Sequence, residues 1–381
     1  MRDIQPNIKE VNLTIEVLSG ICVGGGETET YSCDDYINRE NKIYFLNLAD
    51  IQELFQKGKL TEELLNELYE DKILDKKIER EILKELKSVE VKEDYQNKLE
   101  IHRFANKKKL TETGIEEIKT IMGSTIKGLI RHGFEIYNVK SVKYAFKRND
   151  KNKLLLFGID SINNITTKKE KYSLNRFPKG RYALKNYKCK EEFKSIVYKK
   201  FSDIIFKNVI FSDCEVVKGD FVIEKVESFS RTKGNFIIPS YYEIAYEGSI
   251  FKCKIVDKNV FNGKKEGNLS VNQVYYDNKN FIELSIKSLK RFYSKVIELE
   301  EEYYQIPDRD DKVKSFYSKL RQENSKPNQV VCKLGYSGAI SKTLMCYEEE
   351  NKDMLLPYNL RFMCSNRLPL GWVKINLGEN Q

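Results

Sequence analysis

The chain has 381 residues, 40% of them hydrophobic and 12% aromatic, which is enough apolar surface for two or three packed domains and excludes a disordered chain. No apolar run approaches the roughly 18 residues of a membrane span, and the N-terminus lacks the apolar stretch of a signal peptide, so we expect a cytoplasmic protein with no membrane partner. The eight cysteines form no C-x-x-C pair and there are only two histidines, so the sequence predicts neither a metal site nor a cofactor, while the net charge of +9 favours a polyanionic partner.

The first part of the chain predicts strands around a glycine turn. Residues 12–18 alternate between apolar and polar side chains and predict a strand, and residues 43–48 predict another. Between them lies the glycine turn Gly24–Gly26, whose three residues, Gly24, Gly25 and Gly26, are candidate RNA contacts. Residues 60–86 carry apolar side chains at helical spacing and predict an amphipathic helix.

The stretch IMGSTIKGLIRH, residues 121–132, predicts a helix that begins at a Gly-Ser-Thr turn. Free N–H groups at a helix N-terminus favour anions, and the spacing of four residues places two basic side chains on one face. One interpretation is a phosphate cradle, and the other is a capped helix whose Ile126, Leu129 and Ile130 pack into the core. The candidate phosphate contacts here are Gly123, Ser124, Thr125, Lys127 and Arg131.

Residues 140–200 have weak periodicity and predict a long functional loop. Its part 168–200 has twelve basic and three acidic residues, a net of 12 − 3 = +9, so the rest of the chain sums to zero. Aromatic residues lie among the basic ones, a combination that suits stacking on unpaired bases while cations hold phosphates. The alternative is a solvated loop. The candidate RNA contacts in this segment are Arg176, Lys179, Arg181 and Lys185.

From residue 201 onward the sequence predicts an antiparallel series of strands and then an amphipathic helix over 281–304. A second glycine loop follows at Gly335–Gly338, where Tyr336 either stacks on a base or packs inward. Trp372, in an apolar strand-like segment, is predicted to be a core anchor. The candidate RNA contacts of this loop are Gly335, Tyr336, Ser337, Gly338 and Lys342.

These elements predict an α+β fold in two halves, each with a glycine-rich loop. We place the first domain at residues 1–200, with a helical insertion at about 50–118 and a basic loop segment at about 140–200, and the second domain at residues 201–381. No short-period repeat accompanies them.

The sequence resembles the RAMP superfamily of CRISPR proteins, and within it the subunit that caps the type III-A (Csm) effector complex. The resemblance rests on residues 16–37, on the stretch IMGSTIKGLIR, on FSDCEV with YYEIAYEGSIFKCKI, and on KLGYSGAISKTL with PLGWVKI. Two positions depart from the family pattern: Cys22 stands where the turn usually has His, and Met122 where the helix start usually has Pro.

The resemblance implies two RRM-like (ferredoxin-like) RAMP domains and a non-catalytic subunit that holds the 3′ part of the crRNA. It implies that the Gly123 and Gly335 loops contact the RNA backbone. The implied partners are the crRNA, the target RNA, the backbone RAMP subunit, the small helical subunit and a host trimming nuclease that matures the crRNA 3′ end.

Two enzymatic alternatives remain open. A guide-processing endoribonuclease needs a general base, for which the only histidines are His102 and His132. A target-cutting subunit would use a loop aspartate, for which Asp34 and Asp35 are the candidates, although that Asp-Tyr region is interpreted as part of an extended strand. We expect neither activity.

Overall fold

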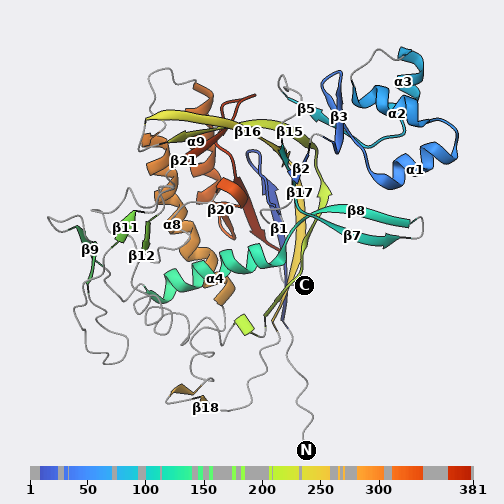
Figure 1. Ribbon diagram of the computed structural model, residues 1–381. Coiled ribbons are helices and arrows are strands. Elements are labelled where there is room, and N and C mark those ends of the chain that lie inside the picture. Colours follow the sequence, from blue (N-terminus) through green and yellow to red (C-terminus); the bar gives the residue numbers. More distant parts are fainter. Residues whose placement is uncertain are drawn as a thin grey trace, which may run out of the picture.

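The computed structural model describes residues 9–24, 30–32, 34–70, 75–92, 100–111, 114–139, 145–148, 154–157, 174–176, 182–184, 206–207, 209–230, 234–257, 265–266, 269–270, 281–303, 311–337 and 359–378. They form two large β-sheets, called sheet A and sheet B below, with long helices against sheet A and a lobe of short helices next to sheet B (Figure 1). This is the α+β class that the sequence predicts.

Sheet A has eight strands in the order β20-β22-β1-β17-β14-β8-β7, with β13 also paired to β17. The alternation in β1 explains its strand: Val11, Leu13 and Ile15 are buried, whereas Asn12 and Thr14 between them are not. The strands are β1 (Lys9–Val17), β7 (Asn106–Thr111), β8 (Gly114–Ile121), β13 (Val209–Phe211), β14 (Cys214–Lys218), β17 (Ile250–Asp257), β20 (Gln329–Lys333) and β22 (Trp372–Leu377).

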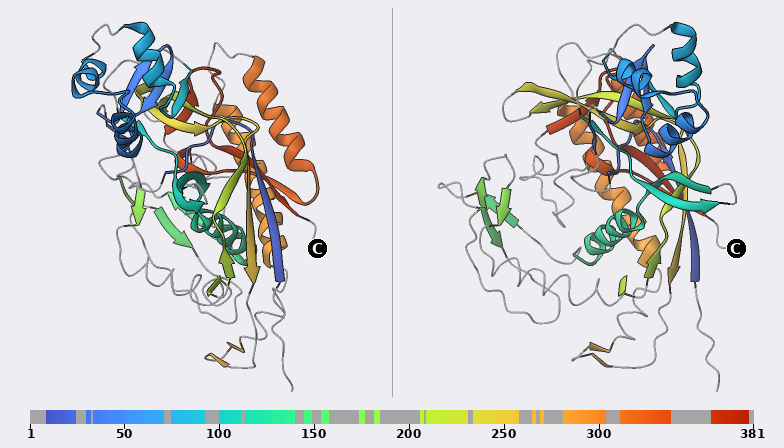
Figure 2. Two further views of the ribbon diagram at one scale, coloured as in Figure 1. Left: turned by 90° about the vertical axis from the view of Figure 1, so that its right-hand side faces the viewer. Right: turned by 45° about the vertical axis from the view of Figure 1, so that its right-hand side comes forward.

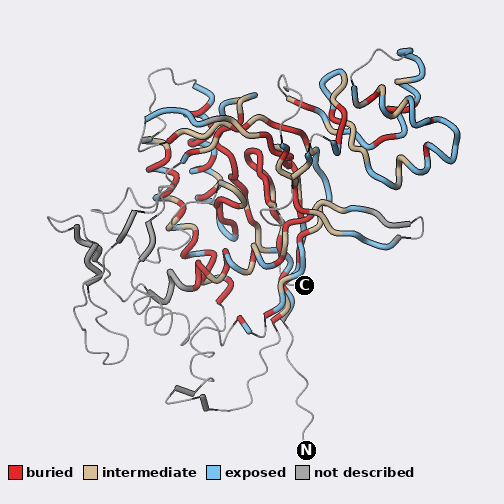
Figure 3. The backbone as a smooth tube through the Cα atoms, viewed as in Figure 1, coloured by how far each residue is buried: buried red, intermediate tan, exposed pale blue. Residues whose placement is uncertain are grey.

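The helices α4 (Gly123–Val139) and α8 (Phe281–Tyr303) pack together against sheet A (Figures 1 and 2). The two helices approach closely where they cross, since a Cβ atom on Gly133 would lie only 2.5 Å from the Ser285 carbonyl oxygen. Only glycine fits at this position. The bounds of α8 confirm the predicted helix over 281–304. Figure 3 shows that buried residues concentrate between this helix layer and the sheet, whereas the β7–β8 hairpin is largely exposed or half-buried.

A third helix, α9 (Asp311–Ser325), covers the outer edge of sheet A and was not predicted. Asn324 near its end accepts a hydrogen bond from the Val331 amide of β20 at 3.0 Å, and its side-chain NH₂ donates to the Lys290 carbonyl and the Ser294 hydroxyl of α8, each at 3.0 Å. One side chain therefore joins α8, α9 and the edge strand, and it satisfies a buried strand amide.

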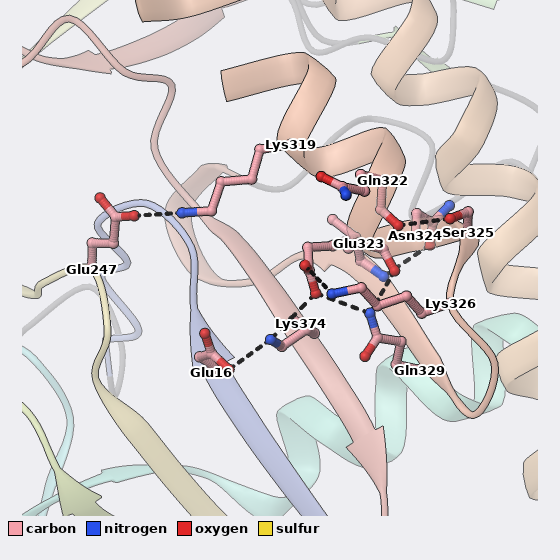
Figure 4. A network of polar contacts seen from close by, with 11 residues as sticks. Glu16, Glu247, Lys319, Gln322, Glu323, Asn324, Ser325, Lys326, Gln329 and Lys374 are labelled. Atoms are coloured by element: carbon pink, nitrogen blue, oxygen red, sulfur yellow. Dashed lines mark hydrogen bonds and ion pairs between the residues drawn. The ribbon is translucent and has the colours of Figure 1, made fainter. Parts of the chain in front are cut away.

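A polar network fixes the same helix to the sheet (Figure 4). The Glu323 carboxylate pairs with Lys326, accepts a hydrogen bond from Gln329 at 3.1 Å, and lies 3.4 Å from the Lys374 ammonium of β22. Lys374 also pairs with Glu16 of β1 at 2.7 Å. Hydrogen bonds from Lys326 foremost, and from Gln329 and Lys374, lower the pKa of Glu323 to about 2.

Sheet B also has eight strands, in the order β2-β6-β16-β15-β5-β4-β3, with β21 paired to β15. Two of its pairs are parallel, β15 with β5 and β16 with β6. The strands are β2 (Thr30–Tyr31), β3 (Tyr36–Arg39), β4 (Lys42–Phe45), β5 (Ser88–Val91), β6 (Ile101–His102), β15 (Phe221–Ser230), β16 (Asn235–Ala245) and β21 (Asn359–Met363).

The helical insertion is divided differently from the prediction. Its helices α1 (Leu48–Gln56), α2 (Glu62–Tyr69) and α3 (Lys76–Leu83) lie between β4 and β5 and enclose a small core of their own. The single helix predicted over 60–86 is wrong because two N-caps start separate helices: Thr61 accepts from the Leu64 amide at 3.2 Å and Asp75 from the Lys77 amide at 2.8 Å. Residues 88–118, also assigned to the insertion, supply strands of both sheets.

Three short antiparallel strand pairs complete the described elements, two of them within the segment that was predicted as a loop over 140–200. The pairs are β9 (Ala145–Arg148) with β10 (Leu154–Phe157), β11 (Leu174–Arg176) with β12 (Tyr182–Leu184), and β18 (Lys265–Glu266) with β19 (Leu269–Ser270). All other residues between 140 and 200 lie outside the described residues.

The division of the chain at residue 200 stays a prediction, but it does not coincide with a division between the sheets. In sheet A, β1 lies between β17 and β22, which come from the second half of the sequence. In sheet B, β5 and β6 from the first half pair with β15 and β16 from the second. Strands from the two halves of the sequence therefore lie side by side in both sheets.

Candidate nucleic-acid interface

The start of α4 is tied to the connection between β13 and β14. The Gly123 amide donates a hydrogen bond to the Asp213 carboxylate at 2.8 Å. A Cβ atom on Gly123 would lie 2.3 Å from the Phe211 carbonyl oxygen and 2.8 Å from that of Ser212. Glycine is thus required at position 123 because the backbone of Phe211 and Ser212 lies so close. The Asp213 carboxylate already accepts a hydrogen bond from one of the free N–H groups at the helix N-terminus.

The other predicted residues of this stretch lie in the first turns of α4. Because the helix begins at Gly123, Ser124 and Thr125 are inside it and do not cap it. Ser124 is exposed, and Thr125, Lys127 and Arg131 are half-buried. The Lys127 ammonium donates to the Val209 carbonyl at 3.3 Å. The predicted apolar face is confirmed, since Ile126, Leu129 and Ile130 are all buried.

The structure brings the first and second glycine loops together. The Tyr336 amide, in the short 3₁₀ helix η2 (Gly335–Ser337), donates to the Cys22 carbonyl at 3.1 Å. Gly335 has a φ of +74°, and a Cβ atom there would lie 2.0 Å from the Cys22 carbonyl oxygen. A Cβ atom on Gly24 would lie 3.1 Å from the Tyr336 ring. Gly25, Gly26, Gly338 and Lys342 lie outside the described residues.

Next to this junction lies a group of half-buried and buried rings, which we call the aromatic cluster: His102, Tyr242 and Tyr336. The His102 and Tyr242 rings stack with centroids 4.5 Å apart and planes 22° apart. The Tyr336 centroid lies 5.8 Å from that of His102 and 5.6 Å from that of Tyr242. The guanidinium of Arg361 on β21 lies 5.9 Å from the Tyr336 ring centroid.

Burial controls the protonation of the cluster. Burial lowers the pKa of His102, the positive charge of Arg361 lowers it further, and Glu100 on the same chain segment opposes the shift. Both burial and the nearby guanidinium therefore favour the neutral form of the His102 imidazole. Burial raises the pKa of the Tyr242 hydroxyl, and it raises the pKa of the Cys22 thiol well above its ordinary range, which leaves the thiol unreactive.

A largely buried ion pair fixes the chain next to the cluster. The Glu243 carboxylate on β16 pairs with Lys119 of β8 at 2.5 Å and accepts a hydrogen bond from the Phe104 amide at 2.9 Å. Phe104 is fully buried and follows His102 by two residues, so this contact fixes the chain directly after the histidine. The glutamate of the YYEIAYEG stretch is thus a positioning group for the interface.

A second buried pair supports the strand that leads into the Tyr336 loop. Lys333, the last residue of β20, is paired with Glu300 of α8, and both are at most 2% exposed. The Tyr317 hydroxyl donates to Glu300 at 3.1 Å, and the Lys333 ammonium lies 5.1 Å from the Trp372 ring centroid. Trp372 itself is fully buried, which confirms its predicted role as a core anchor.

The predicted basic segment can be located only in part. Arg176 is the last residue of β11, whereas Lys179, Arg181 and Lys185 lie outside the described residues. Conversely, no local sequence pattern singles out Arg361, and the sequence identifies His102 only as a candidate catalytic base. The aromatic YYEIAY run was the available signal for Tyr242, while Arg361 becomes visible only through the pairing of β21 with β15.

The candidate catalytic residues are placed as follows. His132 is buried in α4, with its ring edge against Phe292 at 5.5 Å. Asp34 and Asp35 lie in a turn before β3, so the interpretation of this region as extended strand is wrong at these two positions. The reason is local: the Asp35 carboxylate accepts hydrogen bonds from the Ser32 amide at 2.7 Å and the Ser32 hydroxyl at 2.9 Å.

Neither a metal site nor a membrane span is found in the described part of the chain. No group of three or more His, Cys, Asp or Glu residues there is arranged to hold a metal ion. No helix there is sufficiently long and apolar to cross a bilayer. Cys22, Cys214, Cys253 and Cys332 are buried thiols, as expected of small apolar residues.

The fold is found among proteins of known structure, although no family model and no curated protein matches the sequence. One similar chain belongs to a cryo-EM structure of a Csm–crRNA–target RNA ternary complex of a type III-A CRISPR-Cas system. It has a TM-score of 0.53 and 15% identity, with 97% of this chain and 100% of that chain covered. Another is the crystal structure of T. onnurineus Csm5, with a TM-score of 0.54, 16% identity, and 94% and 99% coverage. The chain therefore shares the fold of these Csm chains over nearly its whole length, which confirms the fold that the resemblance implies.

Proposed function

We propose that this chain is an RNA-binding subunit of a type III-A CRISPR effector complex. The observation that carries the proposal is the shared fold, which covers nearly all of this chain and nearly all of each Csm chain. Because both chains are covered almost completely, the likeness is not confined to one part of the chain. One of the similar structures is a complex with crRNA and target RNA, and we propose both as partners here, together with other Csm subunits.

Within such a complex we assign this chain to the 3′ part of the crRNA. The sequence motifs around Gly123 and Gly335 support the assignment, and so does the meeting of the Gly24 and Gly335 loops beside Arg361. In this role the chain caps the filament of backbone RAMP subunits, lies near the small helical subunit, and defines where a host nuclease trims the crRNA. The complex would act in the cytoplasm in defence against phages and plasmids.

We further propose that the subunit itself has no catalytic activity. The observation that favours the alternative, a RAMP endoribonuclease, is His102. Burial lowers its pKa and so favours the neutral imidazole that a general base requires, and its ring centroid lies 5.8 Å from that of Tyr336. Cleavage of repeat RNA by the purified chain alone, lost in His102→Ala, would establish that alternative. Target cutting that disappears from the assembled complex in Asp34→Ala with Asp35→Ala would assign the other nuclease role.

The proposed function is tested by co-purification. The tagged chain is expressed with the other effector subunits of its own host, and the RNA that elutes with it is sequenced. We expect those subunits to co-elute with crRNA whose 3′ ends are sharply defined, and we expect ragged or longer 3′ ends when this chain is omitted. Recovery of the chain alone and without RNA would contradict the proposal.

A further inference from the structure

We propose that the aromatic cluster, with Arg361, binds one unpaired base of the RNA by stacking. This rests on the proposed function and deepens it, because it assigns the cluster a contact with a nucleobase in addition to the contacts that glycine loops make with phosphates. The ligand class is a single-stranded ribonucleotide segment, with the base on the rings and an adjacent phosphate at the guanidinium.

The first argument is the convergence of the residues. His102 comes from β6, Tyr242 from β16, Tyr336 from η2 and Arg361 from β21, and each ring or guanidinium lies at most 5.9 Å from a neighbour in the group. His102 and Tyr242 are directly paired residues of two parallel strands, which places their rings on one face of sheet B. The stacked pair is thus held by backbone pairing.

The second argument is the composition of the group. Tyr242 belongs to a small apolar core and Tyr336 packs against it, so both rings are supported by apolar side chains. Together with Arg361 the cluster offers an imidazole, two phenols and a guanidinium, and His102, Tyr336 and Arg361 all remain partly accessible to solvent. Rings of this kind stack on any base, and an adjacent cation pairs with phosphate.

The third argument is the role of the glycines. Gly335 adopts a φ of +74° and allows η2 to approach the Cys22 carbonyl. Gly24 leaves room for the hydroxyl edge of Tyr336, whose oxygen lies 3.1 Å from the place that a Cβ atom at position 24 would take. The Gly24 and Gly335 loops are predicted from the sequence to contact RNA, and the Tyr336 ring lies where the two loops meet. A base whose flanking phosphates follow the loops would lie at this ring.

The test compares two RNAs on the full-length chain. One is a single-stranded oligoadenylate, and the other is an abasic oligoribonucleotide of the same length, so that both carry the same phosphates. We expect the wild type to prefer the base-bearing RNA, and Tyr336→Leu to reduce that preference about 5- to 150-fold, the range of one aromatic–base stack. Binding of the abasic RNA should stay within about twofold of wild type, and Tyr336→Phe should keep the preference.

Phe236→Leu is the matched control. Phe236 is an aromatic residue on β16, the strand of Tyr242, and it is 49% exposed but outside the cluster. We expect it to keep the full preference for oligoadenylate. An equal loss in both leucine variants, or an unchanged preference in Tyr336→Leu, overturns the stacking proposal. A wild-type chain that binds neither RNA contradicts the proposed function itself.

A measurement without substitutions covers the case in which Tyr336→Leu melts well below wild type. Wild-type chain is irradiated with single-stranded RNA that contains 4-thiouridine, and the crosslinked peptides are identified by mass spectrometry. We expect crosslinks at Tyr336 or His102. Crosslinks confined to other parts of the chain overturn the assignment of a base to the cluster.

Discussion

The amide of Gly123 donates a hydrogen bond to the carboxylate of Asp213 across 2.8 Å, and this contact decides how the start of α4 is built. The sequence predicts a turn that caps the helix and cradles an external phosphate. In the structure the cap is a carboxylate from the β13–β14 connection, 90 residues further along the chain. The Gly123 amide is therefore already engaged, and a phosphate at this helix would contact other groups of its first two turns.

The two glycines at this end of α4 should respond in opposite ways to alanine. Gly123→Ala places a methyl group 2.3 Å from the Phe211 carbonyl oxygen, so we expect a loss of more than about 3 kcal/mol in the free energy of unfolding. At Gly128 the new methyl group would meet no atom of the described residues within 4 Å, apart from its chain neighbours and the backbone of its own helix, and Gly128→Ala should gain about 0.5–1 kcal/mol from helix propensity. Denaturant melts measure both, and equal effects would contradict the backbone-contact argument.

The basic pair of α4 should be needed for guide retention more than for folding. We expect Lys127→Ala with Arg131→Ala to weaken RNA binding by about 1.5–3 kcal/mol for each charge-assisted hydrogen bond removed, and to blur the crRNA 3′ ends. The fold should survive, since both side chains are only half-buried.

The matched control for that pair lies on the neighbouring helix. Lys287 and Arg291 of α8 have the same residue types and the same spacing of four, and both are exposed. Lys287→Ala with Arg291→Ala should leave the guide profile unchanged. Sequencing of RNA from both double variants makes the comparison, and a normal profile from the α4 variant would put the RNA contacts elsewhere.

The basic segment 168–200 should dominate general RNA affinity, because it carries a charge equal to the net charge of the whole chain. Reversal of Lys179, Lys185, Lys188 and Lys190 to Glu should weaken binding to all single-stranded RNAs. The salt dependence should flatten by about 0.7 for each phosphate that is no longer neutralised.

Four exposed lysines on the helices α3, α8 and α9 serve as the control for this charge reversal. They should change affinity less and leave the slope nearly as in wild type. Titrations at several salt concentrations measure both sets, and an unchanged slope in the first set would identify the segment as a solvated loop. The control positions are Lys76, Lys77, Lys287 and Lys314.

We expect Trp372 to contribute to the stability of the fold and not to RNA binding. Its side chain is fully buried beside Tyr293, with ring centroids 6.1 Å apart, so Trp372→Ala should cost about 3–5 kcal/mol. At temperatures where the variant is still folded, its RNA affinity should equal that of wild type. Thermal melts and RNA titrations on one preparation check this, and a normal melt together with impaired binding would reverse the assignment.

Acid should weaken the attachment of α9 through Glu323. Its folded pKa of about 2 lies below the ordinary glutamate pKa of 4.5, so its contribution is complete above pH 4.5 and is lost as the pH falls toward 2. Each pKa unit corresponds to about 1.4 kcal/mol, and solvent screening of this network reduces the loss to roughly 2 kcal/mol. Unfolding free energies between pH 6 and 2 should show this loss in wild type and a smaller one in Glu323→Gln.

Local sequence patterns determined many individual elements. The alternation around Leu13 specifies β1, the stripe through Leu289 specifies α8, and the apolar context of Trp372 specifies a core position, because each depends on side chains a few residues apart. The glycine loops are predictable for the same reason, since glycine at a turn has a local conformational cause. The helix α9 also carries such a pattern in its buried apolar residues at helical spacing, Val313, Phe316, Tyr317 and Leu320.

Tertiary structure alone decided how these pieces meet. Strand pairing joins residues hundreds of positions apart, so nothing local predicts that β1 lies between β17 and β22 or that β21 brings Arg361 to Tyr336. No local pattern predicts the hydrogen bond between Gly123 and Asp213 or the contact between Gly24 and the Tyr336 ring, because both depend on how distant segments pack. The sequence therefore determined which residues are candidates for RNA contact, whereas the folded sheets decided which of them share a surface.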